Sequence, residues 1–312
     1  MNLHIKTPLL ESFPLSNLLG IPVFLKMEAL QPSGSFKNRG IGYICTTYAK
    51  QGSKAFVCSS GGNAGLAAAY SGRKLQIPVT IVVPKTTLPL MIEKIRLEGA
   101  KVIIHGDCWD EADRYAKTLL NEQTTYIPPF DHPLIWKGHS TLIDELHEKP
   151  GAIVTAVGGG GLFCGILEGL HRVGWHDVPV IVVETKGSSS LASSMQAGKI
   201  VELKEVNTIA TSLAAKKVCN AAFEWTQKHT IYPELVTDLS AVDAVMRFAD
   251  DHRILVEPAC GAALSLIYQQ LPLLKQFSSV VVIVCGGAGV TRKMLTLWQE
   301  KFRGGRDEIL AS

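Results

Sequence analysis

The chain has 312 residues, of which 46% are hydrophobic and 19% are charged, and its formal net charge is +3. This length and hydrophobic content support a large core, in two domains or in one large α/β unit. The near-balanced charge, without a basic tract, argues against a nucleic-acid partner. The apolar runs at 79–83 and 280–285 are far too short to span a bilayer, so we expect no membrane partner.

The cysteine pattern and the first residues of the chain bear on where in the cell the protein is expected. The seven cysteines are scattered without a CxxC pair, and an odd number of them in apolar surroundings is typical of reduced thiols. Residues 1–11 lack the basic-then-apolar layout of a signal peptide. The nine histidines show no HxxxH or HExxH spacing, which gives a metal hydrolase little support. We expect a cytoplasmic protein.

Short β-branched runs alternate with helical patterns along the chain. The expected strands are 54–58, 79–83, 101–104, 152–157, 180–183 and 279–284. The expected helices are 64–74, 90–98, 110–121, with Asp110 as its N-cap, and 162–173. Continuous apolar strands that are each followed by a helix predict an α/β protein whose parallel strands are buried on both faces. The proline-rich segment 126–133 is the best candidate for a crossing between two lobes.

Lys37 lies in a turn of small residues and phenylalanine, SGSFK at 33–37, just ahead of a helix-like segment. A solvated lysine has a pKa near ~10.4, but a lysine in a tight, partly desolvated turn loses its proton more easily. A neutral amine forms an imine with an aldehyde, and the aldehyde that commonly uses a protein lysine in this way is pyridoxal 5'-phosphate (PLP). The alternative is an ordinary Gly/Ser turn with a solvated lysine.

Two glycine-rich loops follow expected strands, where open parallel sheets bind their ligands. The first, SSGGNAG at 59–65, exposes backbone N–H groups at a helix N-terminus, which suits a substrate carboxylate. Its Asn63 can hydrogen-bond a ring oxygen or a hydroxyl. The second, GGGG at 158–161, can wrap a phosphate because no Cβ atom stands in the way. Its spacing is not GxGxxG, but Glu184 ends the next strand, so a dinucleotide stays an alternative.

A further loop begins at Cys285, after the strand at 279–284. A thiol at that place can face a heteroaromatic nitrogen as a neutral partner, which does not force the nitrogen to be protonated as a carboxylate would. The alternative is a buried structural cysteine.

Seven motifs follow one another along the chain: LKME at 25–28, PSGSFKNRG at 32–40, SSGGNAG at 59–65, IPPFDHPLIWKGH at 127–139, VGGGGL at 157–162, ILVEPACGAAL at 254–264 and VVVIVCGG at 280–287. Their order resembles the fold-type-II PLP-dependent enzymes, the tryptophan synthase β-subunit group. In detail they resemble its L-serine dehydratase/L-threonine deaminase branch. The resemblance implies two open, twisted, mostly parallel sheets flanked by helices, with PLP in the cleft between two domains. The large domain would be 1–37 plus 133–312, and the small domain 38–132.

The resemblance also implies roles, position by position. Lys37 would be the Schiff-base lysine and catalytic base, with Phe36 on one face of the pyridine ring and Ser212 on the other. Asn63 would bond the 3'-oxygen of the cofactor, and Cys285 would face the pyridine nitrogen. The remaining positions are Ser60, Gly61, Asn63 and Ala64 for the substrate carboxylate, and Gly158, Gly159, Gly160, Gly161 and Leu162 for the phosphate.

The function that the resemblance implies is a PLP-dependent β-elimination. L-serine would give pyruvate and ammonia, and L-threonine would give 2-oxobutyrate and ammonia. A serine racemase or a β-replacement synthase of the same fold stays an alternative. So does a non-catalytic nucleotide- or PLP-binding protein, for which Lys37 would be dispensable.

A homodimer and a bound potassium ion also follow from the resemblance. The ligands of the ion would be the backbone carbonyls of Gly158, Ser188, Leu213 and Ala215. Position 190 carries serine where the racemase branch has a second carboxylate, and a carbonyl-rich site with fewer charges suits potassium better than a divalent ion.

Overall fold

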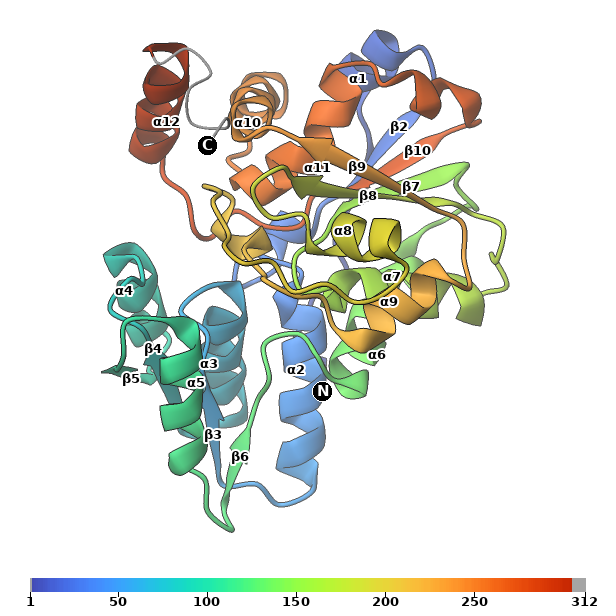
Figure 1. Cartoon of the computed structure of the whole chain (residues 1–312). Coiled ribbons are helices and arrows are strands. Elements are labelled where there is room, and N and C mark those ends of the chain that lie inside the picture. Colours follow the sequence, from blue (N-terminus) through green and yellow to red (C-terminus); the bar gives the residue numbers. More distant parts are fainter. Residues whose placement is uncertain (1, 305–312) are drawn as a thin grey trace.

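The computed structural model describes residues 2–304 and contains two sheets with helices around them (Figure 1). The strands are β1 (Leu9–Glu11), β2 (Val23–Lys26), β3 (Ala55–Cys58), β4 (Val79–Val83), β5 (Lys101–Ile104), β6 (Thr124–Tyr126), β7 (Ala152–Ala156), β8 (Val180–Thr185), β9 (Ile231–Val236) and β10 (Val280–Ile283). The helices are α1 (Phe13–Leu19), α2 (Lys37–Lys50), α3 (Asn63–Leu75), α4 (Pro89–Leu97), α5 (Trp109–Thr118), α6 (Pro133–Ser140), α7 (Gly161–Arg172), α8 (Ser190–Ala197), α9 (Asn220–Thr226), α10 (Asp238–His252), α11 (Pro258–Tyr268) and α12 (Arg292–Gly304).

The larger sheet has the strand order β1-β2-β10-β7-β8-β9, and the smaller sheet has the order β5-β4-β3-β6. All neighbouring strands run parallel except β1, which pairs antiparallel with β2. The two mostly parallel sheets flanked by helices confirm the expected fold class. The Val- and Ile-rich runs form the central strands because both faces of those strands are covered.

Helices cover both faces of the large sheet. Figure 1 shows α1, α10 and α11 on one side of it and α7, α8 and α9 on the other. The large hydrophobic core lies between these layers, and a second core lies between the small sheet and the helices α2, α3 and α4. Every helix within residues 2–304 is too short or too polar to cross a membrane.

Three details differ from the sequence-based expectation. Asp110 is not the N-cap of its helix: α5 begins at Trp109 with Cys108 in the cap position, and Asp110 lies in the first turn, where its charge favours the helix dipole. Strand β5 is not buried on both faces, because it is an edge strand with Ile104 50% exposed. Strands β1, β2, β6 and β9 were not expected from the sequence. Of these, β9 contains Pro233, which an edge strand tolerates.

Candidate active site

Loops that follow strands of both sheets meet around the start of α2. The turn before Lys37 pairs with the loop after β10: the amide of Phe36 donates to the carbonyl of Cys285 at 2.9 Å, and the amide of Gly287 donates to the carbonyl of Gly34 at 2.9 Å. A turn near the start of the chain and a loop near its end therefore form one edge of the site.

A buried ion-pair cluster fixes the start of α2. Arg39, two residues after Lys37, donates through two nitrogen atoms to both carboxylate oxygens of Glu28, each at 2.7 Å. It also donates to both oxygens of Glu145, each at 2.7 Å. Bidentate pairs of this kind define orientation as well as energy, so the first turn of α2 has little freedom to move.

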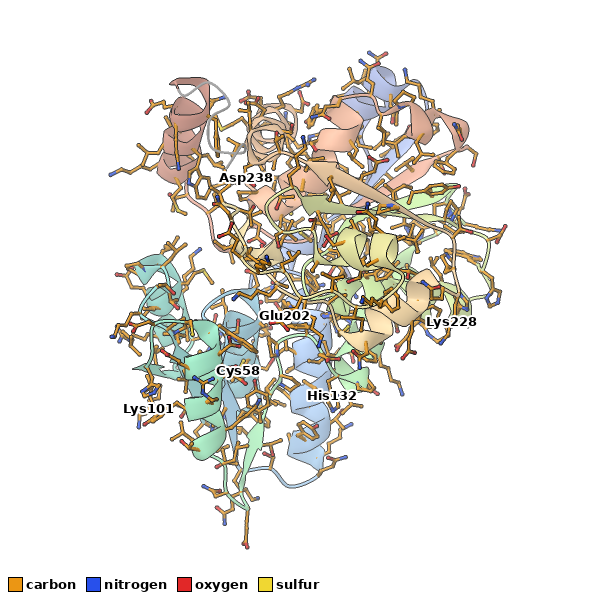
Figure 2. All side chains as sticks on the ribbon, viewed as in Figure 1. Cys58, Lys101, His132, Glu202, Lys228 and Asp238 are labelled. Atoms are coloured by element: carbon orange, nitrogen blue, oxygen red, sulfur yellow. The ribbon has the colours of Figure 1, made fainter. Side chains whose placement is uncertain are left out.

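Lys37 is the first residue of α2, and its amino group is enclosed although part of the side chain is exposed. Its Nζ donates to the carbonyl of Pro129 at 2.5 Å. Burial lowers the pKa of Lys37 to about 8, against smaller opposing effects of Cys58 and Glu257. Cys58, labelled in Figure 2, ends strand β3. A substantial fraction of the amine is therefore uncharged near neutral pH, as imine formation requires.

This shifted pKa predicts a pH-dependent stability of the PLP-free protein. An unfolded chain protonates Lys37 up to its ordinary pKa of about 10.5, so between pH 8 and 10.5 the unfolded state binds more protons than the folded state. The contribution of Lys37 to stability must therefore rise with pH in this window, by about 2 kcal/mol between pH 7.5 and pH 9.5. The measurement is urea unfolding of the wild type and of Lys37→Met: the difference between the two should shrink with pH, and a constant difference would contradict the shift.

Phe36 and Phe130 place the lysine next to the glycine loop. The ring centre of Phe36 lies 5.2 Å from Nζ of Lys37. Phe130, which follows the carbonyl that accepts from Lys37, packs against the loop: a Cβ atom on Gly159 would lie 2.6 Å from its ring. The segment that was expected to cross between lobes thus connects the lysine to the glycines.

The glycine loop offers a run of free amides. Within residues 2–304, the backbone N–H groups of 158–163 donate to no protein acceptor; Cys164 is the first residue of this helix to do so, to the carbonyl of Gly160 at 2.9 Å. Gly160 has a φ of 95°, in the region that favours glycine, and it caps α7 without a side chain. Six unpaired amides at the N-terminus of a 12-residue helix form a site for a dianionic phosphate, and Leu162 contributes one of them.

Glu184 has a different partner from the one a dinucleotide would need. Its two carboxylate oxygens accept from the amides of Leu191 and Ala192, at 2.9 and 2.8 Å, at the start of α8. Burial raises the pKa of Glu184 to about 7. Because Glu184 is only 1% exposed and both of its oxygens accept from the protein, the carboxylate is not accessible to a ribose, and the structure disfavours the dinucleotide alternative.

The loop at 59–65 also presents unpaired groups. Among the described residues, the amides of Gly61, Asn63 and Ala64 donate to no protein acceptor, and they surround the N-terminus of the 13-residue helix α3. The hydroxyl of Ser60 accepts from the amide of Gly62 at 3.3 Å. The side-chain oxygen Oδ1 of Asn63 is buried without a partner. Such groups suit a bound carboxylate and a polar ring substituent.

Glu257, just before α11, is a site residue that the sequence reasoning did not assign. It is only 6% exposed. Its Oε1 accepts from Nδ2 of Asn63 at 2.9 Å and from the hydroxyl of Ser212 at 2.7 Å. It therefore orients both side chains that were expected next to the cofactor ring. A signal was present, since Glu257 is the only charged residue in the otherwise apolar motif at 254–264.

Removing this carboxylate should weaken catalysis without removing the cofactor. Glu257→Ala is expected to lower kcat/KM by about 10–100-fold, because two buried hydrogen bonds to a charged acceptor are lost. Glu257→Gln keeps one acceptor oxygen and should lose less. The measurement is steady-state kinetics beside the exposed control Glu148→Gln; equal rates for Glu257→Ala and the wild type would refute the assigned role.

Cys285 lies behind the lysine turn and is 4% exposed. Its Sγ is 3.2 Å from Sγ of Cys260. The hydrogen bond with Cys260, together with burial, raises the pKa of Cys285 well above that of an ordinary thiol. The side chain therefore stays a neutral thiol, as a neutral ring-nitrogen partner must.

The four residues expected to bind a cation lie close together. The hydroxyl of Ser188 and the amide of Ala215 each donate to the carbonyl of Leu213 at 2.7 Å. A Cβ atom on Gly158 would lie 3.0 Å from Cα of Leu213. In the described part of the chain, no three His, Cys, Asp or Glu side chains converge as a metal site, so any cation here would depend on carbonyl oxygens.

Together these features fit PLP. An enclosed amine lies between six free amides, suited to a phosphate, and the unpaired oxygen of Asn63, suited to a polar ring substituent. Phe36 bonds to Cys285 through the backbone, and Asn63 and Ser212 share the carboxylate of Glu257, so these four predicted residues form connected parts of the site.

Comparisons with known proteins agree with this geometry. The family "Pyridoxal-phosphate dependent enzyme" matches residues 1–286. The chain is 49% identical to a human L-serine dehydratase/L-threonine deaminase, over 96% of this chain and 95% of that protein. The crystal structure of a fungal L-serine ammonia-lyase from Rhizomucor miehei superposes with a TM-score of 0.92 at 42% identity, covering 97% of this chain and 100% of that one.

A more distant likeness concerns the racemase alternative. The structure of maize serine racemase superposes with a TM-score of 0.87 at 25% identity, covering 96% of this chain and 93% of that one. The match to the family spans most of the sequence, and the site supplies the groups that its cofactor needs. The chain therefore belongs to the pyridoxal-phosphate dependent enzymes.

Proposed function

We propose that this protein is an L-serine ammonia-lyase, which converts L-serine to pyruvate and ammonia and L-threonine to 2-oxobutyrate and ammonia. The observation that carries the proposal is the amine of Lys37, which has a pKa of about 8. Its Nζ lies 2.5 Å from the carbonyl oxygen of Pro129, next to Phe130, which packs against the glycine loop. The identities of 49% and 42% to a dehydratase and an ammonia-lyase, against 25% to a racemase, support this reaction.

The residues divide the work as follows. PLP, when bound through Lys37, supplies the electron sink for the pair released at Cα. The free amides of 158–163 would hold its phosphate, and Phe36 and Ser212 would flank its ring. The amides around Asn63 would bind the substrate carboxylate, which fixes Cα near the lysine. Once the amine of the substrate has replaced Lys37 on the cofactor, the freed, uncharged amine of Lys37 would remove the proton from Cα.

The surroundings of Ser212 favour elimination over racemisation. A racemase needs a second group that returns a proton to Cα from the opposite face. The hydroxyl of Ser212 already donates its proton to Glu257 at 2.7 Å. The neutral thiol of Cys285 also favours prompt loss of the hydroxyl group, because it does not stabilise negative charge at Cα through a protonated ring nitrogen.

The test is a side-by-side assay of L-serine, L-threonine and D-serine, with pyruvate, 2-oxobutyrate and chiral serine measured separately. We expect the 2-oxo acids from both L-substrates and only trace interconversion of serine enantiomers. D-serine formed from L-serine faster than pyruvate would show a racemase instead. Bound PLP without turnover would show a non-catalytic binding protein.

We also propose a potassium ion at the carbonyls of Gly158, Ser188, Leu213 and Ala215, which the closeness of these residues supports. Activity in potassium chloride should exceed activity in tetramethylammonium chloride at equal ionic strength. Equal activity in the two salts would contradict the proposed potassium site.

We propose a large domain of residues 1–37 plus 133–312 and a small domain of 38–132, which the division of the strands between the two sheets supports.

We also propose that the protein is a homodimer, which sedimentation would test. A cytoplasmic location is supported by the seven cysteines, which are all free thiols.

A further inference from the structure

Three histidines contact one another outside the candidate active site. His171 lies in the last turn of α7, His176 follows in the next loop, and His229 lies between α9 and β9. Nδ1 of His171 is 3.1 Å from Nδ1 of His176, and Nε2 of His171 is 3.1 Å from Nδ1 of His229. Helices α7 and α9 pack side by side in Figure 1, and Lys228, the neighbour of His229, is labelled in Figure 2.

One backbone carbonyl determines which ring nitrogen atoms of His229 and His171 carry hydrogen. Nε2 of His229 is 2.7 Å from the carbonyl oxygen of Val178, which can only accept. His229 therefore has its hydrogen on Nε2 and a lone pair on Nδ1, and that lone pair accepts from Nε2 of His171. A neutral His171 is then left with a lone pair on Nδ1, which faces Nδ1 of His176.

His176 is free to present a second lone pair to the same point. Its side chain is exposed, and within residues 2–304 its Nε2 forms no hydrogen bond to the protein. The hydrogen of a neutral His176 can therefore sit on Nε2, in contact with water, at little cost. Two lone pairs then converge on one position, which suits a cation.

We propose that Nδ1 of His171 and Nδ1 of His176 bind one Zn²⁺, Ni²⁺ or Cu²⁺ ion, with His229 orienting His171 from behind. Metal bonds to imidazole nitrogen are about 2.0–2.1 Å long. Two nitrogen atoms 3.1 Å apart then subtend about 100° at the metal, between the tetrahedral and the square-planar angle. The carbonyl of Val178, acting through His229, is the kind of outer partner that holds metal-binding histidines in place.

The surroundings decide which ions bind and how strongly. Within residues 2–304, no three His, Cys, Asp or Glu side chains are placed to bind one metal ion together, so water completes the coordination. Imidazole ligands select these transition metals over Mg²⁺ and Ca²⁺. The nearby cations Arg172 and Lys149 are paired with Asp144 and Asp177, which limits their repulsion of a metal ion.

The position gives the site a structural consequence. Helix α7 begins at the glycine loop, and α9 begins next to it, where the amide of Cys219 donates to the carbonyl of Gly159 at 3.0 Å. His171 and His229 join the other ends of these helices. A metal ion that fixes His171 therefore stabilises the pair of helices that frame the glycine loop, and it should raise the melting temperature of the protein.

Titration calorimetry of the PLP-loaded protein with zinc or nickel chloride at pH 7.5 tests the site. We expect one site of micromolar affinity in the wild type, lost in His171→Ala and in His176→Ala. His229→Ala should weaken binding by about 10–100-fold, because it removes the outer partner. The exposed histidine variant His147→Ala should bind as the wild type does, and its melting temperature should rise equally with the metal.

His176 is exposed, so His176→Ala is expected to fold, and its PLP absorbance verifies this. Metal binding of wild-type affinity in His176→Ala would place the ion elsewhere and overturn the proposal. So would a wild type that binds no more tightly than the double variant His171→Ala/His176→Ala.

Discussion

Lys37→Ala is expected to lose the visible imine absorbance and to lower the rate of pyruvate formation from L-serine by at least about 10³-fold. Both losses follow from one atom, since Nζ of Lys37 is the group for the imine and the base for the Cα proton. Lys26 is also buried, but its Nζ is bonded to the carboxylate of Glu145 at 2.5 Å, so it cannot replace Lys37. The measurements are the absorption spectrum with added PLP and the initial rate at saturating L-serine.

The matched control is Lys50→Ala, at the exposed end of the same helix α2, which should keep the spectrum and the rate. Because PLP can still bind without the imine, through the amides of 158–163, the alanine variant should retain weak PLP binding. A Lys37→Ala protein that keeps both the imine band and its activity would show that another amine does the chemistry.

Gly160→Ala is expected to weaken PLP binding by about 10–100-fold, since backbone strain of roughly 1–3 kcal/mol falls on the loop that holds the phosphate. Gly160 has a φ of 95°, and its new Cβ atom would lie 2.5 Å from Cβ of Ala222. Either the backbone rotates or α9 moves away, and both disturb the unpaired amides. The dissociation constant of PLP, measured by fluorescence titration of the PLP-free protein, checks this.

Gly174→Ala is the control for strain alone. Gly174 follows the other end of α7, has a φ of 80°, and has no atom within 4 Å of a new Cβ. Both variants should lose stability, but only Gly160→Ala should lose PLP affinity. Equal PLP affinities in the two variants would mean that the glycine loop does not hold the phosphate.

Most of the central strands were predictable because a continuous apolar run rarely forms another structure. Strands β4 and β5 have the predicted bounds, β3 and β7 are each one residue shorter than predicted, β8 is two residues longer, and β10 is one residue shorter at each end. The edge strands β1, β6 and β9 and the short strand β2 were not predicted. The three edge strands have three to six residues, and most of these residues are partly or fully exposed, so tertiary pairing defines these strands more than local pattern does.

Local sequence also identified the groups that a ligand needs at a loop: a lysine in a small turn, glycines ahead of helices, and Asn63. It did not identify Glu257, whose importance comes from contacts with Asn63 and Ser212, 194 and 45 residues away in the chain. For Lys37, the sequence predicted only that the pKa is lowered. The size of the shift depends on the enclosure of the amine, which distant segments build.

Borohydride reduction of the PLP-loaded protein, followed by peptide mapping, tests the central claim most directly. Reduction turns an imine into a stable secondary amine and so marks the lysine that carried it. The pyridoxyl group should be found on the peptide that contains Lys37 and on no other. A label on a different lysine, or a protein that binds PLP and carries no label after reduction, would contradict the account.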